Sequence, residues 1–193
     1  MLIIMKKNLI CSIILLLVAG TFSLKAQSQG NSTTDVILNG YSAKMFTSEP
    51  VKDTDLDLIL KCGIKAPSAR NTQGWKFTVI KNAGLAGEII KNINPGNIIV
   101  IVSGIDSQQP GTFTEFDCAL ATQNMYIAGQ SLGYGVHIYA GPVGMINQKK
   151  EAYGIPEGYR AISVLRIGSI DKNVDATSSA SARKPFDDIV IYK

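Results

Sequence analysis

The pattern of hydrophobic and polar positions after residue 40 predicts a domain that contains both helices and strands. The strongest helix runs from Phe113 to Leu132, where apolar or small residues occupy most faces, as is typical of a buried helix. A shorter amphipathic helix begins at Asp53 and ends before Pro67. Ile98 to Val102 is continuously apolar and β-branched, which indicates a strand covered on both faces.

Other stretches have weaker patterns. Further strands are expected at Trp75 to Ile80, Val136 to Ala140, Tyr159 to Ile170 and the last residues of the chain. Short helical segments are expected at 85–91 and between residues 144 and 153. Residues 27–39 are expected to be a flexible lead-in, in which a short strand or helix is possible from Asp35 to Leu38.

Residues 1–26 have the features of a secretory signal peptide. Lys6 and Lys7 precede the apolar run from Leu9 to Ala19, and Leu24-Lys25-Ala26 ends on a small residue. We expect cleavage after Ala26 and an exported protein, periplasmic or secreted, with no membrane span in its mature part. An uncleaved N-terminal anchor is the alternative, although the apolar run is short for a span.

Removing the signal peptide changes what the charge implies. The whole chain has a formal net charge of +4, but Lys6, Lys7 and Lys25 lie in the signal, so the mature part carries +1. The clustered basic face expected of a nucleic-acid-binding protein is not apparent, so no nucleic-acid partner is predicted. A single histidine, His137, and the lack of clustered acids and cysteines argue against a metal site.

Two cysteines, Cys62 and Cys118, remain in the mature part. An exported protein could join them in a disulfide. Each of them lies in an apolar helical pattern, however, where free cysteine behaves as a small hydrophobic residue. The sequence therefore favours two buried free thiols.

The polar stretch between Ala66 and Trp75 is the main candidate for ligand binding, because it connects a predicted helix to a predicted strand. Ser68, Asn71 and Gln73 offer hydroxyl and amide groups that both donate and accept hydrogen bonds. The same residues suit a capped loop in which the side chains bind only the backbone. On the pattern alone, the two interpretations are equally good.

The motif A-P-S-x-x-N-x-Q-x-W, from Ala66 to Trp75, and F-x-x-x-P-V, from Phe46 to Val51, resemble the FMN-dependent nitroreductase family, although Gly74 replaces the usual proline. The resemblance extends from about Tyr41 to the C-terminus. It implies one α+β domain, residues 40–193, with a three-layer fold in which helices flank a central mixed or antiparallel sheet. It also implies an intertwined homodimer with the helix 113–132 at its core; an ordinary core helix within one monomer is the alternative.

The resemblance further implies which residues hold the flavin. Ser42 and Lys44 match the phosphate-binding element R-x-S-x-[RK], in which Gly40 stands where an arginine is expected. Lys44 would lie at the N1/O2 edge of the flavin, whereas Ser42 and Arg183 would bind the phosphate. The missing arginine predicts FMN binding weaker by about tenfold to a hundredfold.

Two other segments complete the implied site. The segment with Pro67, Ser68, Ala69 and Asn71 would reach the flavin from the other subunit. The segment with Pro142, Val143 and Gly144 would run past flavin N5, where a glycine allows a close backbone approach.

The activity implied by the resemblance is ping-pong hydride transfer by an FMN-dependent NAD(P)H oxidoreductase of the nitroreductase type. NAD(P)H would reduce the flavin, and a nitroaromatic, a quinone or a similar small acceptor would take the electrons. Two alternatives remain at this point: a non-catalytic flavin-binding protein, and a ligand-binding protein of the same fold that has lost the cofactor.

Overall fold

The computed structural model describes residues 32–107, 112–171, 173 and 182–193. The predicted signal peptide, residues 1–26, lies outside the described residues. Within the predicted lead-in, helix α2 (Ser32–Asn39) forms and packs against the long helix α5 (Thr114–Ser131). No helix in this described part of the chain is both long enough and apolar enough to cross a membrane.

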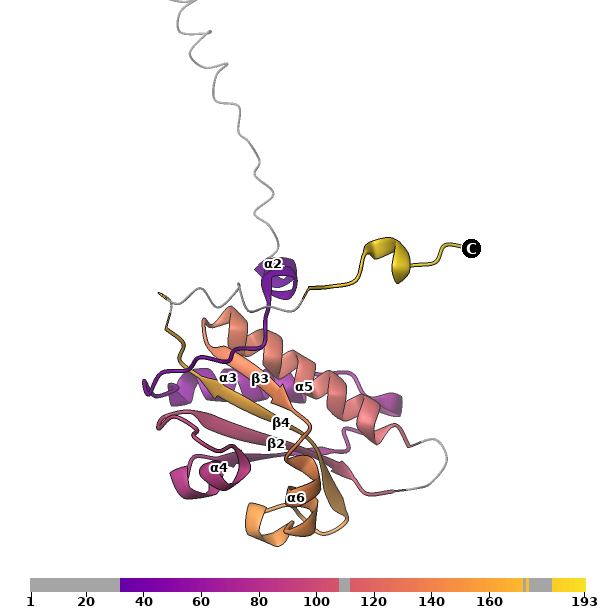
Figure 1. Ribbon diagram of the computed structural model, residues 1–193. Helices are drawn as coiled ribbons and strands as arrows, with labels where there is room; N and C mark the ends of the chain where they lie inside the picture. Colours follow the sequence, from indigo (N-terminus) through magenta and orange to yellow (C-terminus); the bar gives the residue numbers. More distant parts are fainter. Residues whose placement is uncertain (1–31, 108–111, 172, 174–181) are drawn as a thin grey trace, which may run out of the picture.

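A four-stranded sheet lies at the centre of the domain (Figure 1). Its strands are β1 (Trp75–Ile80), β2 (Ile98–Ile105), β3 (Gly135–Tyr139) and β4 (Tyr159–Gly168). Their order across the sheet is β1-β2-β4-β3, and every neighbouring pair is antiparallel. The predicted central sheet is therefore confirmed in its antiparallel form.

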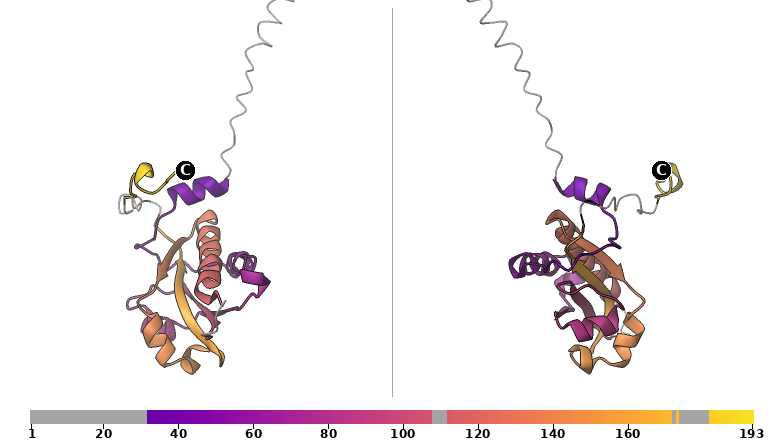
Figure 2. Two further views of the ribbon diagram at one scale, coloured as in Figure 1. Left: turned by 90° about the vertical axis from the view of Figure 1, so that its right-hand side faces the viewer. Right: turned by 60° about the vertical axis from the view of Figure 1, so that its left-hand side comes forward.

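Helices cover both faces of this sheet, which confirms the predicted three layers (Figures 1 and 2). On one face lie α5 and α3 (Asp53–Ile64), and on the other lie α4 (Ala83–Ile89) and α6 (Val143–Gln148). The side chains of β2 alternate between the two resulting cores. Val100 and Val102 pack under α3 and α5, whereas Ile99 and Ile101 pack under α4 and α6. Burial on both sides explains why the β2 sequence is continuously apolar.

One side of helix α5 is only half-buried or exposed, although apolar or small residues on most of its faces predicted a buried helix. That side holds Phe116, Leu120, Asn124, Ile127 and Ser131, which are half-buried or exposed, and Phe116 is 62% exposed. The buried residues lie on another face and are mostly small or polar: Asp117, Cys118, Ala121, Thr122, Met125 and Gly129. This side of α5, with the exposed Phe116, therefore remains partly accessible in a single chain.

The prediction of a C-terminal strand is wrong. Residues 186–188 form a single short 3₁₀ turn, and the segment 182–193 lies apart from the sheet (Figures 1 and 2). A strand forms only beside another strand, and this segment has none next to it. Its apolar residues are left exposed, among them Phe186, Ile191 and Tyr192.

The close contact between α5 and β3 can be tested by adding one methyl group. A Cβ on Gly129 would lie 2.5 Å from Cγ2 of Val136. Overpacking costs about 1–3 kcal/mol, against a gain of about 1 kcal/mol for replacing a helical glycine with alanine. We therefore expect Gly129→Ala to lower the free energy of unfolding, as measured by urea denaturation.

Gly87→Ala in α4 is the matched control, because no atom lies within 4 Å of a Cβ at that position. This substitution should raise the free energy of unfolding by about 0.5–1 kcal/mol. Equal effects of the two substitutions would contradict the close packing of α5 on β3.

Candidate functional site

The segment that carries Ser42 and Lys44 runs beside the edge strand β3. The N–H of Ala43 donates to the carbonyl of Val136 at 3.1 Å, and Nδ1 of His137 donates to the carbonyl of Ala43 at 2.7 Å. These two bonds bury Ala43 and leave Ser42 and Lys44 exposed on either side of it. Both predicted flavin-binding side chains are thus presented at one edge of the sheet.

A buried arginine fixes the end of the same segment. Arg166 lies on β4, and its guanidinium carbon is 3.9 Å from the centre of the Phe46 ring. The guanidinium also donates to Oδ1 of Asn97 and Oδ1 of Asn94, each at 2.8 Å. Asn97 in turn donates to the carbonyl of Thr47 at 2.9 Å. Burial lowers the pKa of Arg166 from its ordinary value.

The residues predicted to pass flavin N5 form the start of α6. Pro142 precedes the helix, and the N–H of Val143 donates to the carbonyl of Ala140 at 3.1 Å. Apart from its chain neighbours and the backbone of its own helix, nothing lies within 4 Å of a Cβ placed on Gly144, so the space beside this exposed residue is open. The predicted loop is therefore a helix start, because the chain turns into α6 directly after β3.

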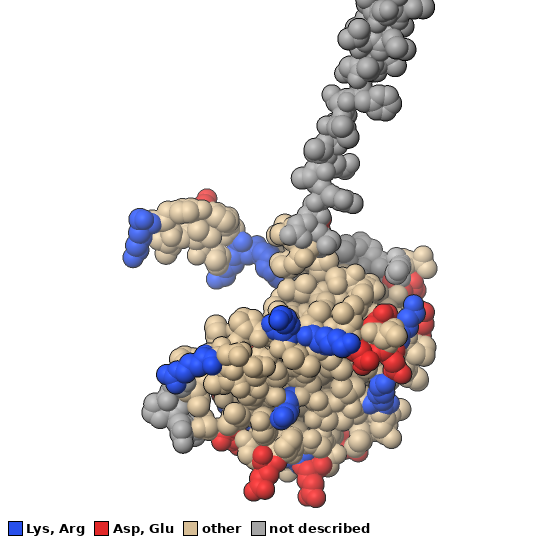
Figure 3. Space-filling view, turned by 180° about the vertical axis from the view of Figure 1, so that it is seen from behind, with Lys and Arg blue, Asp and Glu red and all other residues tan. Residues whose placement is uncertain are grey.

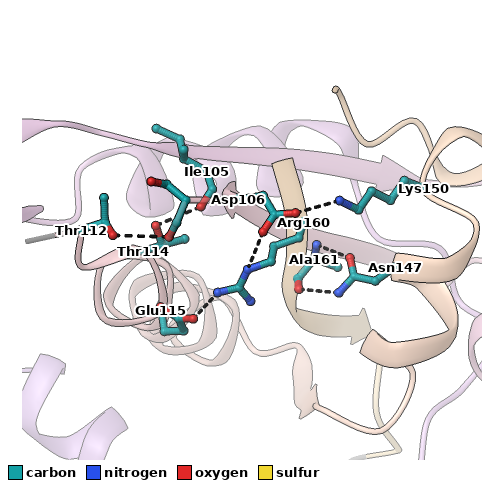
Figure 4. A network of polar contacts seen from close by, with 10 residues as sticks. Ile105, Asp106, Thr112, Thr114, Glu115, Asn147, Lys150, Arg160 and Ala161 are labelled. Carbon is teal, nitrogen blue, oxygen red and sulfur yellow. Dashed lines mark hydrogen bonds and ion pairs between the residues drawn. The ribbon is translucent and has the colours of Figure 1, made fainter. Parts of the chain in front are cut away.

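Helix α6 is attached to the sheet by one side chain that the sequence did not single out (Figure 4). Asn147 donates from Nδ2 to the carbonyl of Ala161 at 3.1 Å, and its Oδ1 accepts from the N–H of Ala161 at 2.7 Å. These bonds satisfy both backbone groups of Ala161 on β4 and fix α6 against the strand.

Next to Asn147, an ionic network joins four elements (Figure 4). Asp106, after β2, pairs with Lys150 at 3.1 Å and with Arg160 of β4 at 3.4 Å. Arg160 also binds Glu115 in the first turn of α5. The pKa of Glu115 is lowered, first by its own backbone N–H and then by Arg160.

The predicted ligand-binding loop has an unusual backbone. A 3₁₀ turn covers Ala69–Asn71, and three residues have positive φ: Arg70 at 54°, Asn71 at 56° and Gln73 at 48°. The hydroxyl of Ser68 accepts from the N–H of Gln73 at 3.0 Å. Ser68 therefore does what the capped-loop interpretation predicts, while the side chain of Asn71 is exposed.

Asp117 of α5 joins this loop to the body of the domain. Its Oδ1 accepts from the N–H of Ala69 at 2.9 Å, and its Oδ2 accepts from the hydroxyl of Thr72 at 3.4 Å. The carboxylate residue is only 5% exposed. Sequence reasoning missed Asp117, although an acid within an otherwise apolar helical pattern was a signal for it.

The structure brings together only part of the predicted site. Ser42 and Lys44 lie along β3, and Pro142, Val143 and Gly144 follow the same strand. The loop with Pro67 to Asn71 leads into β1, at the opposite edge of the sheet. Three strand spacings, about 14 Å, separate the two edges. Arg183 is exposed on the C-terminal segment, apart from both edges (Figure 1).

Gly40 is more crowded than the family pattern suggests. A Cβ at this position would lie 2.7 Å from Oε1 of Gln130 and 2.8 Å from the carbonyl of Val36. The Gln130 side chain can move, but the Val36 carbonyl belongs to the backbone of α2. An arginine at residue 40 therefore requires a shift of this helix.

The thiols of Cys62 and Cys118 are both free, which resolves the two interpretations in favour of unpaired cysteines. Cys118 is buried, but Cys62 is only half-buried. Burial, and next the charge of Asp117, raise the pKa of Cys118 to about 12. In the described residues, no group of three or more histidine, cysteine or acidic side chains could hold a metal ion.

Charged side chains of both signs occur on the face shown in Figure 3. Basic groups lie mainly over the middle and left of this face and acidic groups mainly at its right-hand and lower margins, among wide areas of uncharged residues. Of the described residues in this view, none form a continuous basic area.

Comparison with known proteins connects this geometry to a family. The sequence profile of the Nitroreductase family matches residues 37–96, which include both the Ser42 segment and the polar loop. A candidate NADH dehydrogenase/NAD(P)H nitroreductase of Archaeoglobus fulgidus is 29% identical over 139 residues, 66% of this chain and 79% of the relative. The family model and these relatives support the nitroreductase family for this chain.

Solved nitroreductase structures share the fold. A nitroreductase from Desulfovibrio desulfuricans in complex with FMN superposes with a TM-score of 0.72 and 22% identity, covering 84% of this chain and 97% of that one. A nitroreductase with bound FMN from Bacteroides fragilis gives a TM-score of 0.69 at 21% identity, covering 84% and 100%. The predicted nitroreductase fold is confirmed, while the roles of individual site residues stay predictions.

The two thiols should differ in reactivity, since the thiolate is the nucleophile in thiol chemistry. At pH 8, a thiol with a pKa of about 12 carries almost no thiolate. We expect a disulfide-exchange reagent to modify one thiol, Cys62, in the folded protein lacking residues 1–26. A second thiol should react only after unfolding.

Cys62→Ser should abolish the reaction of the folded protein, and Cys118→Ser should leave it unchanged. Rapid modification of Cys118 in the folded state would contradict its burial.

Proposed function

We propose that this nitroreductase-family protein is an FMN-dependent NAD(P)H oxidoreductase that reduces small electron-poor acceptors. The observation that carries the proposal is the line of groups along β3: exposed Ser42 and Lys44, followed by the open backbone at Gly144. The names of the relatives point the same way, since one of them, from Vibrio harveyi, is an NADPH-flavin oxidoreductase with 25% identity.

The groups along β3 suit the chemical character of FMN. An ammonium such as that of Lys44 would offset the negative charge that the flavin N1/O2 edge gains on reduction. The hydroxyl of Ser42 would bind the phosphate, and Arg183 would join it once the C-terminal segment of either chain packs onto the β3 edge. Because Gly40 supplies no cation, we expect this site to bind the phosphate more weakly than a nitroreductase site that has an arginine at the equivalent position.

The second half of the site would come from another chain. Asn71 and its neighbours lie at the β1 edge, about 14 Å across the sheet from β3, so they and Lys44 of the same chain are poorly placed for one flavin ring. The proposal therefore includes a homodimer that covers the exposed Phe116 side of α5 and that places the loop of one chain at the β3 edge of the other.

When bound, FMN would supply the redox chemistry, taking a hydride from NAD(P)H and delivering electrons to a nitroaromatic, a quinone or a similar molecule. The chain would orient the ring through Lys44, the loop and the Gly144 backbone, and would leave one ring face accessible to both substrates in turn. Export of the mature chain, as the sequence predicts, is part of this proposal.

The visible spectrum of the purified mature protein, with FMN added, tests the proposal. Flavin absorbance should remain with the protein after gel filtration and should bleach when NADH or NADPH is added without oxygen. Bound flavin that neither nucleotide reduces would support a non-catalytic flavin-binding protein. A colourless protein that does not bind added FMN would support a ligand-binding protein that has lost the cofactor.

Sharing of the site between chains predicts complementation in mixed dimers. Lys44→Ala and Asn71→Ala should each weaken FMN binding in homodimers, since a lost hydrogen bond costs about 0.5–1.5 kcal/mol and a bond to a charged group costs about 1.5–3 kcal/mol. A dimer of one chain of each variant would contain one intact site and one doubly altered site.

Co-expression with two affinity tags isolates this mixed dimer. FMN titration should then recover half of the sites at wild-type affinity. If every site in the mixed dimer stays weak, both residues act within one chain and the shared site is wrong. Unchanged melting temperatures of both variants would separate binding from folding.

A further inference from the structure

The buried carboxylate of Asp117 has no role in the chemistry described so far, yet it contacts the loop that the proposed function places on the flavin. We propose that Asp117 is a positioning residue that holds residues 68–73 in the conformation that binds the flavin ring of the neighbouring chain. This inference rests on the proposed function for its ligand. Its structural part rests on the contacts of Asp117 alone.

The backbone of the loop explains why a holding group is needed. Arg70, Asn71 and Gln73 all have φ between 48° and 56°, a region that residues other than glycine rarely occupy. Such conformations cost free energy and persist only where the surrounding structure fixes them. With three such residues among four, the isolated segment would not keep this shape without contacts from the rest of the domain.

The contacts of Asp117 are placed where they restrain the strained residues. One carboxylate oxygen binds the N–H of Ala69, and the other binds the hydroxyl of Thr72. Arg70 and Asn71 lie between these two attachment points. The bond between Ser68 and Gln73 closes the loop on itself, and the bond from Ile105 N–H to the Gly74 carbonyl attaches its end to β2. Asp117 is thus the link between the strained turn and helix α5.

An acid is well suited to this position. Asp117 is in the first turn of α5, where the helix dipole favours negative charge. A carboxylate offers two acceptor oxygens in one plane, which suits two donors about one turn apart. Asparagine has nearly the same shape and can accept from Ala69 and donate to Thr72. We therefore expect Asp117→Asn to keep most of the flavin affinity that Asp117→Ala loses.

The experiment compares Asp117→Ala with the wild-type dimer in two independent measurements. The first is flavin affinity, which should weaken by about tenfold to a hundredfold, because two hydrogen bonds no longer hold the loop. The loop would contact the ring, so FMN and riboflavin should be affected equally. At saturating FMN, the visible spectrum of the bound flavin should also differ from wild type, which a loss of global stability alone would not cause.

The second measurement needs no flavin. Arg70 is exposed within the loop and is a trypsin site. Asp117→Ala should speed cleavage after Arg70, whereas Asp117→Asn should stay near the wild-type rate. Glu115→Ala is the matched control, since it removes another acid from the first turn of α5 without touching the loop.

The outcomes separate the inference from the proposed function. Wild-type affinity for FMN and wild-type cleavage at Arg70 in Asp117→Ala would overturn the role of Asp117, as would equal effects of Glu115→Ala. A wild-type protein that binds no flavin would contradict the proposed function. Faster cleavage at Arg70 in Asp117→Ala would still show that Asp117 holds the loop. If Asp117→Ala does not fold, Thr72→Val removes one contact and should weaken flavin binding by about threefold to tenfold.

Discussion

Burial of the central strands β2 and β4 on both faces of the sheet is the constraint on which the rest of this structure depends. β2 pairs with β1 and β4, and its side chains enter two separate cores. An antiparallel sheet covered on both faces needs helices on each side, and the chain supplies α3 and α5 for one layer and α4 and α6 for the other. With both faces occupied, only the edges β1 and β3 and the strand ends remain for a ligand.

The two edges differ in what they offer. The segment of Ser42 and Lys44 runs along β3 and is fixed there by His137 and by the buried Arg166 with its asparagine partners. At β1, a strained polar loop is fixed by the carboxylate of Asp117. Each edge therefore presents exposed side chains on a backbone that is already fixed, which lowers the cost of ordering that backbone when a ligand binds. Neither edge alone surrounds a flavin.

Helix α5 contacts both the sheet and the polar loop, because different sides of the helix make different contacts. One side packs on the sheet so closely that Gly129 has no room for a methyl group beside Val136. Its first turn holds the polar loop and the ionic network around Arg160. A further side, with Phe116, remains exposed in the single chain. The sequence of α5 lacks a strong two-sided pattern because its buried side includes the polar Asp117 and Thr122, whereas its exposed side includes the apolar Phe116.

The sequence by itself determined most of the elements of the sheet and its helices, and the family that the chain resembles. Continuous apolar residues identified β2, alternation identified β1, and the short motifs around Ser42 and from Ala66 to Trp75 carried the resemblance to nitroreductases, because these are local properties of neighbouring residues. Only the tertiary structure decided which edge each motif occupies, which face of α5 is buried, and that Ser68 binds its own loop while Asp117 holds that loop from 48 residues away. Contacts between distant segments depend on strand order and helix packing, and no local pattern of residue types encodes them.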